Sequence, residues 1–242
     1  MYKKPTLSII TVCLNEPLLQ RTCESIVNQT FQNFEWIVID GGSNEATLNI
    51  FERYKYRINY FVSESDGGIY FGMNKGIQQA HGTWLNFMNA GDLFINYNIL
   101  NIINYKLKKI KKIDILYGNY IVGDSNIIIP APKPNKDNFY FKNFCHQCSF
   151  VRNKILKKYK FDTQFKICAD WDLWNKLFFR GYMFRHIDLG IARFYENGMS
   201  HINKKDVFKE ISYIRKKYYT KNDILKLKEN QIQNLRKMIN NR

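Results

Sequence analysis

LSIITVCL, at Leu7–Leu14, is an almost continuously apolar stretch with several β-branched residues. Such a stretch is typical of a parallel strand that is buried on both faces. Asn15-Glu16-Pro17 follows, and Pro17 suits the first turn of a helix that we expect to reach about Asn28. A buried strand followed directly by a helix predicts the first unit of an α/β fold.

The same alternation of strand and helix continues through the first hundred residues. The predicted strands are Phe34–Asp40, Ile58–Ser63 and Trp84–Met88, and the predicted helices between them are Glu45–Tyr54 and Ile69–Ala80. This order predicts a doubly wound, mostly parallel sheet with right-handed crossovers. Ligands of such sheets bind outside the carboxyl ends of the strands, so the residues at those ends are the first candidates for a site.

The alternation becomes less regular after Asp92. Helices are predicted at 99–109 and 171–180, and strands at 113–122, 126–129, 184–187 and 192–195. Two basic amphipathic helices, at about 206–219 and 223–240, are expected to finish the chain.

The composition narrows the class of protein. The chain has 242 residues and five cysteines, an odd and scattered set that argues against a disulfide framework. The polar segment Met1–Pro5 lacks a secretory signal, and no apolar run approaches the roughly 18 residues of a membrane span. We therefore expect a reducing, cytoplasmic location.

The net charge of +16 suggests an anionic partner or a bias in composition. Half of this excess lies in residues 201–242, where 12 Lys and Arg stand against 4 Asp and Glu. A nucleic-acid partner is not expected, because the aromatic residues fall in predicted core elements and no recognised binding module is present.

The last predicted helix places four apolar residues on one face, Leu225, Ile232, Leu235 and Ile239. This face is consistent with a helix on an anionic membrane, with a homodimer contact, or with a helix packed on its own domain. We favour packing with incidental attraction to the inner face of the plasma membrane.

Acidic and polar residues follow nearly every strand of the first half. Asp40 precedes Gly41-Gly42, so it suits either a nucleotide contact or an Asx turn that caps the next helix. Asp92 suits a divalent cation, which takes one or two carboxylates with substrate phosphate, or an ordinary turn. Asp170 begins a helix, where a carboxylate acts as a general base or as an N-cap.

Several motifs occur in an order that resembles the family 2 inverting glycosyltransferases of the GT-A fold, of the bacterial polysaccharide and O-antigen type. The most specific stretch is SESDGGIY at 63–70, followed by MNKGI at 73–77 and AHG at 80–82. The others are SIITV at 8–12 with Asn15-Glu16, EWIVIDGGS at 35–43, CHQ at 145–147 and ADWDL at 169–173.

This resemblance implies a GT-A, Rossmann-like sheet in residues 1–203, with a nucleotide-sugar half (1–92), an acceptor half (93–203) and a basic helical tail (204–242). It implies that a sugar moves with inversion from a UDP-sugar to a glycan or lipid-linked acceptor. Asp170 would be the base and Asp92 the ligand of Mn²⁺ or Mg²⁺. The implied donor contacts are Thr11, Asn15, Glu16, Asp40, Asp66, Lys75 and Asn89, and the implied acceptor or lid contacts are His146, Asp172 and His201.

The sequence departs from the family pattern at two places. Asn89 and Gly91 stand where the metal motif usually has acids, and Ala169 precedes the base where Glu is usual. Metal binding would then depend mainly on Asp92.

Other enzyme classes fit less well. No G-x-G-x-x-G follows the first strand, so a dinucleotide-dependent oxidoreductase lacks its phosphate turn. A nucleotidyltransferase acting on sugar phosphates is the nearest competitor, and it would release pyrophosphate rather than a nucleoside diphosphate.

Overall fold

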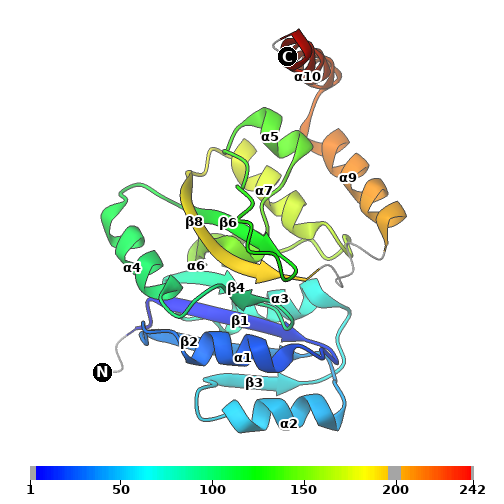
Figure 1. The fold of residues 1–242 in the computed structure, drawn as a ribbon. Helices are drawn as coiled ribbons and strands as arrows, with labels where there is room; N and C mark the ends of the chain where they lie inside the picture. The colour runs from blue at the N-terminus through cyan, green and yellow to red at the C-terminus, as the bar shows by residue number, and fades with distance from the viewer. Residues whose placement is uncertain (1–3, 196–202, 241–242) are drawn as a thin grey trace.

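The computed structural model describes residues 4–195 and 203–240, with the side chains of 4–195 and 203–233. Within these residues one eight-stranded sheet has the order β3-β2-β1-β4-β7-β6-β8-β5 (Figure 1). β1 (Leu7–Cys13) lies between β2 (Phe34–Asp40) and β4 (Trp84–Phe87) and is parallel to both. β3 (Tyr60–Ser63) is parallel to β2 at the edge, so the first half has the predicted parallel core.

Alternate residues of the buried strands pack into two hydrophobic layers. Leu7 and Ile9 face α1 (Leu19–Val27), α2 (Glu45–Tyr54) and α4 (Ile99–Lys109). Ile10 and Val12 face the opposite layer, which contains α3 (Ile69–Gln79), α6 (Asn153–Tyr159) and α7 (Ala169–Phe179). Each fully buried aliphatic side chain contributes about 1.5–3 kcal/mol, so both layers fix the sheet and its helices together.

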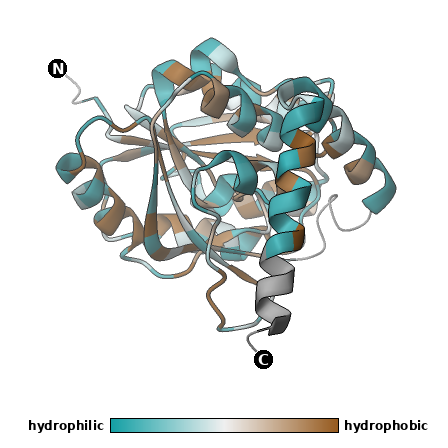
Figure 2. Ribbon diagram, turned by 90° about the horizontal axis from the view of Figure 1, so that it is seen from above, coloured by the Kyte–Doolittle hydropathy of each residue, from teal (hydrophilic) through white to brown (hydrophobic). Residues whose placement is uncertain are grey.

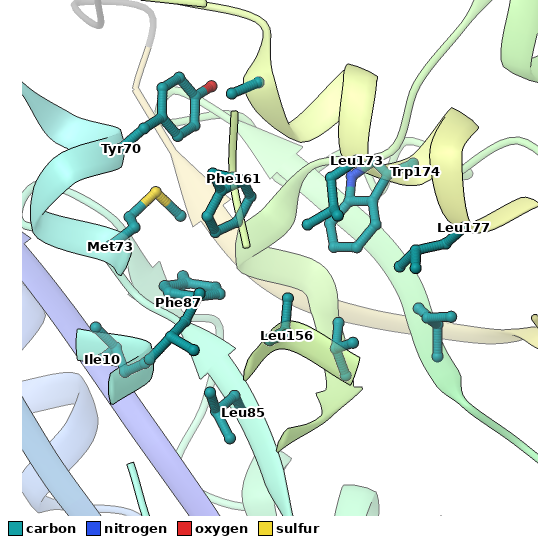
Figure 3. Close-up of a cluster of buried hydrophobic side chains, with 14 of the residues drawn as sticks. Ile10, Tyr70, Met73, Leu85, Phe87, Leu156, Phe161, Leu173, Trp174 and Leu177 are labelled. Atoms are coloured by element: carbon teal, nitrogen blue, oxygen red, sulfur yellow. The ribbon is translucent and has the colours of Figure 1, made fainter. Parts of the chain in front are cut away.

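Helix α3 approaches β1 closely because glycines face the strand. A Cβ atom on Gly72 would lie 2.7 Å from Cγ1 of Val12, and one on Gly76 would overlap Ile10. Farther along the same layer, Phe161 packs against Tyr70 and Phe87, with ring centroids 5.4 and 5.2 Å apart (Figure 3). This contact joins the first half of the chain to the second.

The second half completes the sheet with antiparallel pairs as well as one parallel pair. β7 (Ser149–Arg152) is antiparallel to both β4 and β6 (Ile115–Val122). β8 (Phe184–Phe194) is parallel to β6, and β5 (Leu93–Phe94) is antiparallel to β8 at the other edge.

The second half also contains the main differences from the predicted elements. Residues 126–129 form only an isolated bridge, Tyr120 with Ile129, and the two strands predicted at 184–187 and 192–195 are one continuous strand. Five elements had not been predicted: β5, α5 (Lys136–Phe141), the 3₁₀ helix η1 (His146–Cys148), β7 and α6. These segments are short, so they lack the repeated apolar spacing that reveals a longer helix or strand.

The two C-terminal helices differ in how much of them is packed. α9 (Lys204–Tyr218) lies on α7 and buries Ile214 completely. α10 (Lys221–Asn240) projects from the body, and its Leu227 packs with Tyr140 and Tyr219 (Figure 1). Two residues of the apolar face predicted from the sequence, Leu225 and Ile232, remain 59% and 50% exposed. Figure 2 shows hydrophobic bands along the otherwise hydrophilic helix that leads to the C-terminus. None of the helices in the described part has the length and apolar character required to cross a bilayer.

Candidate active site

A cavity of about 550 Å³ opens beyond the carboxyl ends of β1 and β4. Its polar lining comes from the loop after β1, the turn after β4, the short 3₁₀ helix η1 (His146–Cys148) and the start of α7. The polar residues of its lining include Glu16, Asn89, Asp92, His146, Gln147 and Asp170. We call this cavity the cleft.

Asp170 lies in the first turn of α7, and its carboxylate is only partly satisfied. Cys168 occupies the N-cap position, so Asp170 is not the capping residue that the sequence had allowed. Its Oδ1 accepts a hydrogen bond from the Trp171 N–H at 2.8 Å, and the Tyr70 hydroxyl lies 3.4 Å away. A carboxylate with such open positions can accept a further proton or hydrogen bond from a ligand in the cleft.

His146 joins Asp170 to the turn after β4. Its Nδ1 lies 3.4 Å from Oδ2 of Asp170, and its Nε2 lies 3.0 Å from Nδ2 of Asn89. The Asn89 amide nitrogen is a donor, so Nε2 must accept and the ring proton resides on Nδ1, facing Asp170. Asn89 therefore sets the tautomer that lets His146 donate to Asp170.

Asp92 also borders the cleft, and its carboxylate is hydrogen-bonded to Gln147. Its Oδ2 accepts a hydrogen bond from Nε2 of Gln147 at 2.7 Å. Burial raises the pKa of Asp92 to about 7, and the charge of Glu16 adds to this effect, while His146 and the bond from Gln147 oppose it. Near neutral pH the Asp92 carboxyl group thus exchanges between its protonated and ionised forms.

Oxygen atoms around Asp92 fit a hard cation in part. Oδ1 of Asn89 and Oε1 of Gln147 are buried and accept no hydrogen bond from the described residues. Across 4–195 and 203–233, however, no group of three His, Cys, Asp or Glu side chains could hold a metal ion. The residues therefore fit Mn²⁺ or Mg²⁺ only as one carboxylate with amide oxygens, the rest of the shell coming from substrate phosphate and water.

Asp40 is fully buried and both of its oxygens are occupied. Oδ2 accepts hydrogen bonds from the backbone N–H groups of Gly42 and Ser43 and from the Ser63 hydroxyl, at 3.1, 2.8 and 2.6 Å. Oδ1 accepts one from the Ser43 hydroxyl at 2.5 Å. Asp40 does not line the cleft, and its visible role is to hold the loop after β2 in shape.

Three further residues predicted to contact the donor lie in β1 or directly after it. The Thr11 side chain is fully buried, does not line the cleft, and accepts a hydrogen bond from Nε1 of Trp36 at 2.9 Å. Asn15 is exposed and receives the N–H of Asn44 at 2.8 Å. Glu16 lines the cleft, where its Oε1 accepts the N–H of Leu18 at 2.9 Å.

Asp66 and Lys75 lie together in a separate hollow of about 320 Å³. Lys75 forms an ion pair with Glu64 at 2.5 Å. Oδ1 of Asp66 accepts the N–H of Gly68 at 2.8 Å, whereas its buried Oδ2 has no partner in the described chain. The structure therefore does not bring Lys75 into the cleft that holds Asp92 and Asp170.

Asp172, predicted as an acceptor or lid contact, does not line the cleft. It is fully buried beneath α9, where it accepts hydrogen bonds from Lys217 and Tyr218 at 2.8 and 2.9 Å and pairs with Lys176 at 3.1 Å. These contacts attach α9 to α7, which is incompatible with direct contact to an acceptor. His201 lies outside the described residues.

The structure adds cleft residues that the sequence had not singled out, four of which are Gln147, Tyr70, Val207 and Ile211. Gln147 lies within the quoted CHQ motif, and Tyr70 lies within SESDGGIY, so their neighbours carried a signal. Val207, with Ile211 on the next turn of α9, forms an apolar wall of the cleft. Nothing in the local sequence indicated that a helix of the basic tail would reach this far.

Comparison with known proteins gives a consistent picture. The family model described as glycosyl transferase family 2 matches residues 8–160, more than half of the chain. A PGL/p-HBAD biosynthesis glycosyltransferase of Mycobacterium bovis is 29% identical over 173 residues, which cover 69% of this chain and 68% of that protein. An uncharacterized glycosyltransferase of Methanocaldococcus jannaschii is 27% identical over 238 residues, covering 90% and 81%.

Solved structures share the fold at low sequence identity. S. aureus TarS 1–349 in complex with UDP-GlcNAc superposes with a TM-score of 0.70 at 19% identity, covering 86% of this chain and 66% of that one. The mannosyltransferase PcManGT from Pyrobaculum calidifontis, in complex with GDP-Man and Mn²⁺, has a TM-score of 0.61 at 15% identity, covering 79% and 57%. The chain thus spans less than two thirds of either solved structure.

Proposed function

The chain belongs to glycosyltransferase family 2 and has the GT-A fold, and from this premise we propose that it transfers a sugar, with inversion, from a UDP-sugar to a hydroxyl of a glycan or lipid-linked acceptor in cell-surface polysaccharide synthesis. The mycobacterial relative named for PGL/p-HBAD biosynthesis supports an acceptor of this kind. The TarS complex with UDP-GlcNAc supports a uridine diphosphate donor.

The observation that carries the proposal is the convergence of Asp170 and Asp92 on one cleft. In the proposed reaction Asp170 accepts the proton of the acceptor hydroxyl while the acceptor oxygen bonds to the anomeric carbon. The bond from that carbon to the diphosphate oxygen breaks at the same time, with its electron pair leaving on the diphosphate. Attack from the face opposite the leaving group inverts the anomeric configuration.

Asp92, with the amide oxygens of Asn89 and Gln147, would hold a divalent cation. When bound, the cation neutralises negative charge on the departing diphosphate. The unpartnered oxygens of the two amides support this assignment, as does the Mn²⁺ in the PcManGT structure. His146 faces Asp170 across 3.4 Å, and Glu16 borders the donor side of the cleft.

Two of the residues predicted to contact the donor, Asp40 and Asn15, do not line the cleft and would instead support the loops beside the donor. Asp40 fixes the loop after β2, and Asn15 ties the loop after β1 to the same region through Asn44. Asp66 and Lys75, in the separate hollow, would contact the donor only if part of it reached beyond the cleft.

The C-terminal helices suit peripheral attachment to an anionic membrane at its cytoplasmic face. α9 exposes Phe208 and Tyr213, and α10 exposes Leu225 and Ile232, among many lysines. Exposed apolar side chains enter the bilayer interface while lysines meet acidic headgroups. Sedimentation with vesicles containing phosphatidylglycerol tests this, and equal binding to purely zwitterionic vesicles would contradict it.

The central experiment is a thermal-shift screen of UDP- and GDP-sugars with and without Mn²⁺, followed by analysis of the reaction products. We expect stabilisation by a UDP-sugar that depends on Mn²⁺, and release of UDP. Release of pyrophosphate from a nucleoside triphosphate would instead identify a nucleotidyltransferase, and would overturn the proposal.

A further inference from the structure

A single carboxylate from α9 holds the segment that leads into the turn carrying Asp170. Oε1 of Glu210 accepts the N–H of Lys166 at 2.8 Å. Its Oε2 accepts the N–H groups of Ile167 and Cys168 at 3.1 and 2.8 Å. Hydrogen bonds to an ionised carboxylate are roughly twice as strong as neutral ones, so these three contacts fix the segment 166–168 firmly.

The same segment is held from the other side of the cleft. The Tyr70 hydroxyl, on α3, donates to the Ile167 carbonyl oxygen at 2.6 Å. Cys168, the N-cap of α7, has no side-chain capping hydrogen bond of its own, and its carbonyl accepts the N–H of Asp172. The direction in which α7 begins therefore depends on backbone contacts made by Glu210 and Tyr70.

Asp170 lies only two residues beyond the segment that Glu210 holds. Its nearest side-chain neighbours, His146 and Tyr70, are both 3.4 Å away and too distant to fix the carboxylate by themselves. The position of Asp170 is thus set mainly by its backbone. A displacement of about 1 Å at a reacting group can cost about 10²-fold in rate.

We propose that Glu210 is a positioning residue for Asp170, and that α9 consequently forms part of the catalytic unit rather than a separable tail. This inference rests on the proposed function of Asp170 as general base. Two features of α9 on adjacent turns support this. Val207 and Ile211 line the cleft, and Glu210 holds the segment 166–168.

The first test measures how strongly Glu210 protects the backbone amides of residues 166–168. Glu210→Gln keeps the size of the side chain but removes its charge and one acceptor oxygen. By hydrogen–deuterium exchange of the full chain we expect amides 166–168 to exchange at least about 10-fold faster, with β1 and β2 unchanged. Glu229→Gln, an exposed carboxylate on α10, is the matched control and should change nothing at 166–168. Unchanged exchange in Glu210→Gln would overturn the proposal.

The second test separates positioning from a general loss of folded protein. UDP release from UDP-GlcNAc is followed, and UDP affinity with Mn²⁺ is measured by calorimetry. Glu210→Gln should lower kcat about 10- to 100-fold with UDP affinity within 2-fold of wild type, and Glu210→Asp should restore part of the rate. Wild-type kcat, or an equal loss of kcat and UDP affinity, would contradict positioning.

A double variant distinguishes failure of this inference from failure of the proposed function. If Glu210 acts through Asp170, adding Glu210→Gln to Asp170→Asn lowers the residual rate no further. A second 10-fold loss in the double variant would show that Glu210 acts independently of Asp170. If Asp170→Asn itself retains full activity, the proposed function has failed, while the exchange measurement still decides whether Glu210 holds the segment.

Discussion

The carboxyl end of β2 and the first turn of α7 each carry an aspartate, and the surrounding residues hold the two side chains in opposite ways. Asp40 accepts four hydrogen bonds of 2.5–3.1 Å from its own loop and from Ser63. Asp170 accepts one short bond, from the Trp171 N–H, and its other neighbours lie 3.4 Å away. Asp40 is fully buried, whereas the Asp170 side chain is 18% exposed and borders the cleft.

This contrast separates a carboxylate that builds a site from one that acts in it. Four donors leave Asp40 little capacity for a new partner, and the loss of its charge would leave those donors unsatisfied. Asp170 keeps a free acceptor position toward the cleft, as proton transfer requires. The variants that follow test this separation, from the largest expected effect to the smallest.

Asp170→Asn removes the proton acceptor while keeping the size of the side chain. We expect the rate of UDP release to fall about 10³-fold, within the range that general-base catalysis contributes. UDP affinity in the presence of Mn²⁺ should stay within 2-fold of wild type in the same preparation. A rate near that of wild type would show that Asp170 is not the base, and that neither Asp40 nor Asp170 takes part in the chemical step.

Asp40→Asn should act on stability rather than on the chemical step. The amide nitrogen would face donors that now meet a carboxylate oxygen, so we expect a loss of about 3 kcal/mol in the free energy of unfolding. Urea denaturation measures this, with Asp206→Asn on the exposed surface of α9 as the control. A fully stable variant that loses only UDP affinity would instead support the nucleotide contact that the family resemblance predicts.

Most of the first half of the fold could be predicted from the sequence, because its long buried strands have a pattern that few other structures share. Glu45–Tyr54 and Phe34–Asp40 have the predicted bounds. The second half was harder, since β7 has only four residues and pairs with strands distant in sequence. Such pairing depends on tertiary contacts that no local pattern contains.

The candidate site could also be predicted only in part. Motif order indicated that Asp92 and Asp170 belong to one site, and both border the cleft. The spacing of residues could not show that Thr11 bonds Trp36, that Asp172 attaches α9, or that Lys75 pairs with Glu64. These outcomes depend on which neighbours surround a side chain after folding, and the neighbours come from other elements.

Asp92→Asn tests a third carboxylate, which borders the cleft as Asp170 does but accepts a side-chain hydrogen bond as Asp40 does. Burial raises the pKa of Asp92 to about 7, above the value of 3.8 for an unperturbed group. Between these values the unfolded chain releases a proton that the folded chain retains, so wild type loses stability as the pH rises from about 4 to 7. The variant lacks this loss.

We therefore expect Asp92→Asn to gain about 3 kcal/mol on wild type between pH 5 and pH 8, in urea denaturation with a chelator present. The comparison of the two proteins cancels other titrating groups. A gap that does not change with pH would show that Asp92 is ionised throughout. Mn²⁺ should reverse the trend in wild type alone, because the cation requires the ionised carboxylate.

Thr11→Val should have the smallest effect and the sharpest implication for the donor side. Valine has nearly the same shape, so the change removes the bond from Trp36 to the threonine hydroxyl and leaves the indole N–H unsatisfied in the core. That loss should lower the free energy of unfolding by about 1 kcal/mol, with UDP affinity unchanged within 2-fold. If UDP affinity fell 10-fold in the stable variant, Thr11 would contact the donor after a rearrangement of β1. Thr11 would then be a donor-binding residue and not only a support for the core.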